Sequence, residues 1–191
     1  MIVLSGNDIS VSFGGETLFH DVNFRLEENG RAGLVGVNGC GKTTLMHVIN
    51  GRQEAETGGI SKAAGIKLGC MEQYVIRDDN ITLYDEVLEI FRPLIDAENE
   101  LADIAVAIDT GDHSEQTLSR QMQLQERFER EGGLTYKSMT CSALVGLGFS
   151  EDDFNKPISV MSGGQKSKAQ LAKLLLSGSN ILLLDEPTNH L

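Results

Sequence analysis

A glycine-rich stretch in the first third of the chain ends in a lysine followed by a hydroxyl residue. Residues 36–43 read GVNGCGKT. Glycines let successive backbone N–H groups turn inward on a polyphosphate, and the positive end of a following helix adds to the attraction. Lys42 would place a charge on the β- and γ-phosphates, and the Thr43 hydroxyl would ligate Mg²⁺. The stretch therefore predicts a binding loop for ATP and Mg²⁺, made of Gly36, Asn38, Gly39, Cys40, Gly41, Lys42, Thr43 and Thr44.

Two carboxylates follow an apolar run near the end of the chain. Asp185 and Glu186 come directly after ILLL at 181–184. A carboxylate at the C-terminal end of a buried parallel strand lies where open α/β sheets bind ligands, so Asp185 is predicted to hold Mg²⁺. Glu186 would lie on the other side of the strand and act on the water that attacks the γ-phosphate. An ordinary glycine turn and a pair of strand-ending acids are the alternative interpretations of the two motifs.

The elements that must position these residues follow from the hydropathy pattern. Alternation over 8–13 and 21–26 predicts two antiparallel strands joined through a glycine turn. An apolar run over 31–36 predicts a buried strand leading into the glycine-rich loop, and KTTLMHVIN after it predicts a helix. Further strands are predicted near Ile60, over 67–71 and over 181–184. The last is apolar at every position, which predicts a strand buried on both faces of a parallel sheet.

The middle of the chain is acidic and has a helical period. Residues 78–131 carry 15 acidic and 4 basic side chains, in a chain of 191 residues with a formal net charge of −12. Apolar residues recur there at steps of three and four, and the helix is expected to restart or kink at Pro93. A second helix over 114–130 is predicted to carry Leu118, Met122, Gln125 and Phe128 along one face. Two more helices are predicted over 135–145 and 164–176.

Composition excludes several classes of protein. No apolar run approaches the roughly 18 to 20 residues that span a bilayer, and the N-terminus lacks a signal-peptide pattern. The three cysteines, Cys40, Cys70 and Cys141, are far apart and odd in number, which argues against a disulfide framework and a zinc site. These features predict a soluble, cytoplasmic protein with no direct membrane insertion.

A third motif resembles the signature of a known family. Ser162-Gly163-Gly164-Gln165, followed by a helix and then by the carboxylate strand, is similar to the signature of ATP-binding cassette (ABC) ATPases. The resemblance covers essentially the whole chain, with mild departures at Met161, where the family usually has leucine, and Lys168, where it often has arginine. It implies that Ser162, Gly163, Gly164 and Gln165 bind a phosphate of nucleotide held on a facing cassette.

Two further residues match the family by their order along the chain. Gln73 resembles the glutamine that contacts Mg²⁺ and the attacking water. Phe13 resembles the aromatic residue that stacks on adenine, with a core phenylalanine as the alternative. The resemblance implies that ATP is hydrolysed to ADP and phosphate, with Lys42, Gln73 and Glu186 as catalytic residues and Thr43, Gln73 and Asp185 at the metal.

The implied fold is α/β. It is a P-loop cassette with an antiparallel β subdomain, a mostly parallel core sheet and a helical subdomain that carries an arm-like insertion. The expected divisions are 1–77 for the nucleotide-binding core, 78–160 for the helical subdomain, and 161–191 for the signature helix and the last core strand.

The final residues indicate a branch of the family. EPTNHL at 186–191 resembles the EPTNHLD of the ABC-F group, in which two cassettes share one polypeptide and act on the ribosome in translation or antibiotic resistance. The long segment between Gln73 and Ser162 is expected to contain the arm of that group. Being acidic, it would contact protein or apolar surface, or act through Arg120, Arg127 and Arg130.

The resemblance also implies that the sequence is a first cassette, truncated before the strand that bears the switch histidine. Its partners would be the second cassette and the ribosome, and its open sheet edges would favour self-association. Alone, it would hydrolyse ATP very slowly. The alternatives are the ATP-binding subunit of an ABC transporter, a DNA-associated ATPase, for which the helical segment is too short, and a nucleotide-binding switch without catalysis.

Overall fold

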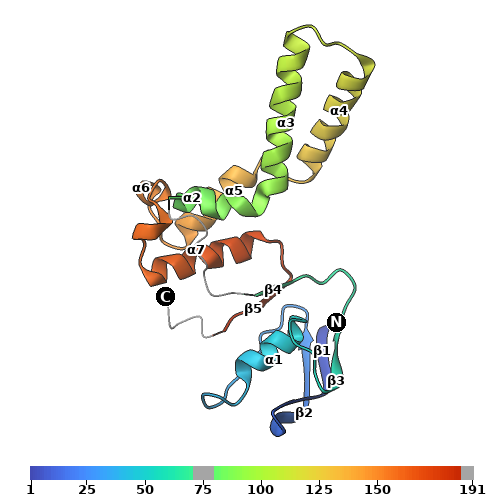
Figure 1. Cartoon of the computed structure of the whole chain (residues 1–191), viewed down its shortest axis with the longest axis vertical. Helices are drawn as coiled ribbons and strands as arrows, with labels where there is room; N and C mark the ends of the chain where they lie inside the picture. Colours follow the sequence, from blue (N-terminus) through green and yellow to red (C-terminus); the bar gives the residue numbers. More distant parts are fainter. Residues whose placement is uncertain (71–79, 186–191) are drawn as a thin grey trace. The chain divides into compact units, whose positions relative to one another are not determined.

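The computed structural model describes residues 1–70 and 80–185 (Figure 1). The chain divides into two compact units. The strand unit contains the described residues 1–70 and 178–185, and the helical unit contains 80–177. The signature helix thus belongs to the helical unit, whereas the sequence-based divisions joined it to the last core strand at 161–191.

A long antiparallel hairpin organises the strand unit. It consists of β1 (Ile2–Phe13) and β2 (Glu16–Glu27), and β3 (Thr57–Lys62) pairs with the other edge of β1. Leu4, Ile9 and Val11 of β1 form a core with Leu45 and Val48 of α1 (Lys42–Ile49). The predicted antiparallel subdomain is confirmed, and its first two strands are longer than the alternating pattern indicated.

A short parallel pair completes the strand unit. β4 (Leu68–Cys70) runs parallel to β5 (Ile181–Leu183), and the Lys67 amide donates to Asn180 Oδ1 at 2.9 Å. Ile181 is buried, but Leu182 is 37% exposed. The prediction that this strand is buried on both faces is therefore wrong. Leu182 is partly exposed because the described part of this sheet is small: within the described residues, β5 pairs with β4 alone.

The segment 31–37 differs most from its predicted structure. We expected a buried strand over 31–36, but the structure has no strand there, and every residue from 31 to 37 is exposed. Val35 is 94% exposed. An apolar run becomes a strand only when a neighbouring strand offers a ladder, and none of the strands in 1–70 and 80–185 pairs with it. The segment enters the glycine-rich loop without regular secondary structure.

The helical unit contains the elements between β4 and β5. They are α2 (Leu83–Leu88), η1 (Glu89–Phe91), α3 (Arg92–Asp109), α4 (Glu115–Arg130), α5 (Tyr136–Gly146), α6 (Glu151–Phe154), η2 (Ile158–Val160) and α7 (Gly163–Leu176). Pro93 lies in the first turn of α3, as predicted, since proline there loses no intrahelical hydrogen bond. α2, α5 and α7 pack around Leu83, Val87, Leu144 and Ala169. Among the described helices, none has both the length and the apolar character that a membrane crossing needs.

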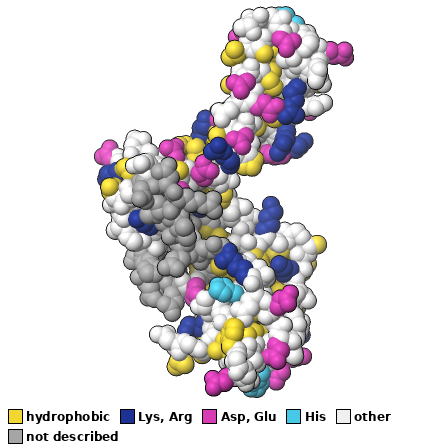
Figure 2. Space-filling view, viewed as in Figure 1, with side chains coloured by type: hydrophobic (Ala, Val, Ile, Leu, Met, Phe, Trp, Pro, Cys, Tyr) yellow, Lys and Arg dark blue, Asp and Glu magenta, His cyan; other side chains and the backbone are white. Residues whose placement is uncertain are grey.

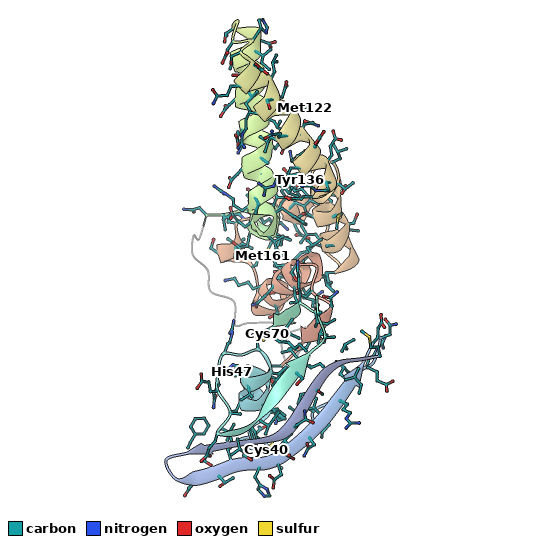
Figure 3. All side chains as sticks on the ribbon, turned by 90° about the vertical axis from the view of Figure 1, so that its right-hand side faces the viewer. Cys40, His47, Cys70, Met122, Tyr136 and Met161 are labelled. Carbon is teal, nitrogen blue, oxygen red and sulfur yellow. The ribbon has the colours of Figure 1, made fainter. Side chains whose placement is uncertain are left out.

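Helices α3 and α4 form a hairpin whose surface mixes acidic and basic side chains (Figures 1 and 2). Its inner face contains Leu94, Ala97, Leu124 and Phe128. Of the four residues predicted to share one face of the second helix, Phe128 is buried, whereas Leu118, Met122 and Gln125 are exposed. α4 packs against α3 through Leu124 and Phe128, so Leu118 and Met122 lie outside this contact. Met122 is on the outer surface of the hairpin (Figure 3).

A polar contact fixes the base of this hairpin. The Tyr136 side chain is buried, and its hydroxyl donates to Glu98 Oε2 of α3 at 2.5 Å. Lys137 Nζ donates to Glu98 Oε1 at 2.8 Å. These hydrogen bonds, that of Lys137 foremost, hold the pKa of the Glu98 carboxyl below its usual value. The hairpin is therefore tied to α5 by charge as well as by apolar packing.

Candidate nucleotide-binding site

The glycine-rich loop ends at the N-terminus of α1, where Gly41 is the cap residue with φ 96°. That left-handed conformation favours glycine, and Gly39 shares it with φ 83°. Gly41 has no side chain to cap the helix, so the amides of the first turn of α1 remain available to an anion. A Cβ on Gly36 would lie 2.5 Å from Cys40 Sγ, so a larger residue there would require the Cys40 side chain to move.

The Lys42 side chain turns back over this loop. Its Nζ donates to the carbonyl oxygens of Gly36 at 3.0 Å and Val37 at 3.1 Å. A lysine ammonium has three donors, so one remains for a phosphate oxygen. Lys42 therefore braces the loop and presents its charge on the same side as the first-turn amides.

An open pocket of about 430 Å³ lies over the loop. It is lined by Phe13, Leu18, Asn38, Gly39, Gly41, Lys42, Thr43 and Thr44. The Phe13 side chain is 56% exposed there, so it is not the core phenylalanine of the alternative interpretation. The structure thus brings together the predicted aromatic residue and the predicted loop, and it adds Leu18 of β2, which no sequence pattern marked.

The two predicted magnesium-binding oxygens meet although they lie far apart in the sequence. Thr43 Oγ1 donates to Asp185 Oδ2 at 2.6 Å. A hydroxyl and a carboxylate are hard oxygen ligands of the kind that Mg²⁺ accepts beside phosphate and water oxygens. The donor set therefore fits Mg²⁺. Within residues 1–70 and 80–185, no group of three or more His, Cys, Asp or Glu forms an all-protein metal cage.

The structure does not describe two of the predicted site residues. Gln73 and Glu186 lie outside the described residues. Their proposed roles at the metal and at the attacking water rest on the order of motifs along the chain.

The signature residues form an exposed helix N-terminus in the helical unit. Ser162 caps α7: its hydroxyl accepts the Gln165 amide at 3.2 Å, and the Gln165 Oε1 accepts the Ser162 amide at 2.9 Å. This reciprocal pair is a capping box, a local role that the sequence S-x-x-Q allowed and that our phosphate assignment of Gln165 overlooked. Gly163 and Gly164 follow in the first turn, with Ser162 and Gly163 exposed.

Cysteine labelling offers a first test of the pocket. Cys40 is exposed in the loop, whereas Cys70 and Cys141 are half-buried, and burial raises the pKa of the Cys70 thiol. We expect an alkylating reagent to modify Cys40 first, and MgATP to slow that reaction because nucleotide would cover the loop. Mass spectrometry of the labelled peptides measures both rates. Equal labelling of Cys40 and Cys141, unchanged by ATP, would contradict the assignment of the loop.

Known relatives match nearly the whole chain. YdiF of Bacillus subtilis (strain 168), named as an ATP-binding protein, is 37% identical over 100% of this chain and 30% of its own length. The ATP-binding protein Uup of Haemophilus influenzae is 32% identical, over 100% of this chain and 29% of its own. The ABC transporter F family member 5 of Arabidopsis thaliana is 31% identical, over 96% and 27%. The chain thus spans less than a third of the length of these relatives.

Solved structures and a family model agree on the fold. The structure of an ATP-binding subunit of an ABC transporter matches with a TM-score of 0.63 at 19% identity, covering 97% of this chain and 67% of that one. An ATP-binding cassette in a dimeric, post-hydrolysis state with ADP and Pi matches with a TM-score of 0.64 at 18% identity, covering 98% and 75%. These matches confirm the predicted α/β cassette fold. The model of the ABC transporter family matches residues 19–189. The chain therefore belongs to the ABC transporter family, of which it forms an ATP-binding cassette domain.

Proposed function

We propose that this chain is the ATP-binding part of an ABC-F-type ATPase that acts on the ribosome, in translation or in protection against antibiotics, in the cytoplasm. The observation that carries the ATPase assignment is the hydrogen bond between Thr43 and Asp185, which gathers the predicted metal ligands beside Lys42 and the first turn of α1. The resemblance of EPTNHL and the printed name of the Arabidopsis relative support the branch.

Each residue of the site has a role in binding or hydrolysis in this proposal. The amides of the first turn of α1 and the Lys42 ammonium hold the β- and γ-phosphates and offset the charge that develops on transfer. Thr43 and Asp185 would hold Mg²⁺, which would supply positive charge to offset that of the phosphates. Phe13 stacks on the base. Gln73 and Glu186 are assigned to the metal and to the attacking water by the family resemblance.

A second cassette completes the site in this proposal. The exposed N-terminus of α7 at Ser162, Gly163 and Gly164 has the dipole and the free amides to bind a phosphate on a facing cassette. A solved cassette of this fold is dimeric with ADP and Pi bound, which supports pairing as the working form. The facing cassette is a second half of the same polypeptide in the full-length protein.

Ribosome binding tests the finer part of the proposal. The chain, with a non-hydrolysable ATP analogue and Mg²⁺, is expected to sediment with ribosomes through a sucrose cushion, and less of it when Lys42→Ala removes the phosphate charge. A parallel experiment replaces the ribosomes by membrane vesicles, prepared from the cells that supply the ribosomes. Sedimentation with the vesicles but not with ribosomes would support the ATP-binding subunit of a transporter instead. That result would not contradict the assignment of the ATP-binding site.

A further inference from the structure

Leu18 of β2 touches both the pocket and the backbone of the phosphate loop. It lines the pocket beside Phe13. A Cβ on Gly41 would lie 2.9 Å from both Leu18 Cγ and Leu18 Cδ2, and 2.8 Å from Phe19 Cδ1. The Gly41 backbone is therefore packed directly against β2, at the residue that caps α1.

We propose that Leu18 is a positioning residue: it holds Gly41 so that the first-turn amides of α1 keep the direction in which they bind phosphate. This rests on the proposed function in that it requires the loop to bind a polyphosphate. Leu18 would thus act on the phosphate end of the site although it belongs to the hairpin that carries the base-stacking residue.

The need for such a brace follows from what precedes the loop. Residues 31–37 are exposed, have no regular secondary structure and pair with none of the described strands, so the described sheets do not hold the loop from that side. β2, in contrast, pairs with β1, and the register shifts where Phe19 lies opposite Val11 and Thr17 opposite Ser12. Leu18 is the extra residue of β2 at this shift, and irregularities of this kind redirect a side chain, here toward Gly41.

Leu18 and Phe13 then have separable effects. Phe13 would contact only the base, because stacking uses the face of its exposed ring. Leu18 contacts the loop backbone, so shortening it should loosen amides that bind any polyphosphate, whether or not a base is attached. A base-free ligand therefore distinguishes a positioning residue from a wall of the base pocket.

The test compares MgATP with magnesium tripolyphosphate by calorimetry on the full chain. We expect Leu18→Ala to weaken both ligands by the same factor, about tenfold, since small displacements of binding groups are costly. Phe13→Ala should weaken ATP alone, and Leu18→Met, which restores most of the volume, should recover wild-type affinity. Val22→Ala, which truncates a partly buried residue of the same strand that packs against the core cluster, controls for loss of stability.

Hydrogen exchange of the 36–44 peptide gives a second, ligand-free measurement. Exchange should be faster in Leu18→Ala and unchanged in Leu18→Met and Phe13→Ala. The inference is overturned if Leu18→Ala leaves this exchange unchanged, or weakens ATP without weakening tripolyphosphate. Absence of ATP binding by the wild-type chain would be a different result, because it would refute the proposed function itself.

Discussion

Replacing Lys42 by alanine is expected to weaken MgATP binding by about a hundredfold, the effect typical of losing a charged donor from a preorganised site. Lys42 has two structural hydrogen bonds, to the Gly36 and Val37 carbonyl oxygens, besides the charge it offers to phosphate. The substitution removes the charge and also frees those carbonyl oxygens to face the anion. Calorimetric titration of the purified chain measures the change.

Two variants control this result. Lys62→Ala removes the same charge from β3, from a residue that does not line the pocket, and should bind MgATP as the wild type does. Asp185→Asn keeps the shape of the side chain that accepts the Thr43 hydroxyl but removes its charge. It should therefore weaken the binding of MgATP more than the binding of metal-free ATP, which is measured with a chelator present. Unchanged binding in Lys42→Ala would refute the assignment of residues 36–44 as the nucleotide loop.

The structural features predicted correctly are those encoded within a short stretch of chain. The glycines of the loop, the helix that starts at Lys42 and the restart at Pro93 depend on local conformation, which residue type determines. The β1–β2 hairpin is likewise local, because its strands are joined by a short glycine turn. The meeting of Thr43 with Asp185 could be anticipated because two motifs of one family implied a common site.

The errors concern properties that depend on distant neighbours. The run over 31–36 has the composition of a buried strand, but a strand also needs a partner, which the sequence pattern does not supply. Leu182 is partly exposed for the same reason. The buried face of α4 was misjudged at Leu118 and Met122 because its packing against α3 decides which side turns inward. Leu18 carried no signal, since its contact with Gly41 exists only after β2 folds onto the loop.

ATP turnover by the chain is expected to require pairs of copies, and to be very slow in dilute solution. In the proposed site the phosphate loop belongs to one cassette and the α7 N-terminus to another, so a single copy would lack donors whose loss typically costs about a hundredfold or more in rate. Phosphate release per copy should therefore rise with protein concentration. A rate per copy independent of concentration, at the level of a two-cassette relative, would contradict the composite site.

Self-association through the exposed segment 31–37 must be separated from this pairing. Leu34, Val35 and Val37 present exposed apolar side chains on a segment that pairs with none of the described strands, which favours association of any kind. Association of that type should not depend on nucleotide. Pairing across ATP should appear in light scattering only when MgATP is present, and should be absent in Lys42→Ala.

Complementation between two inactive variants gives the decisive measurement. Lys42→Ala removes the phosphate charge but keeps Ser162, whereas Ser162→Asp keeps the phosphate loop and places a negative charge where phosphate would bind. Aspartate is a good N-cap, so α7 should stay folded in that variant. Each variant alone should be inactive. Their equal mixture should recover activity, at most about half of the wild-type rate, because each mixed pair contains one intact site of the two. Activity of Ser162→Asp alone would show instead that the α7 N-terminus does not contact the reacting nucleotide.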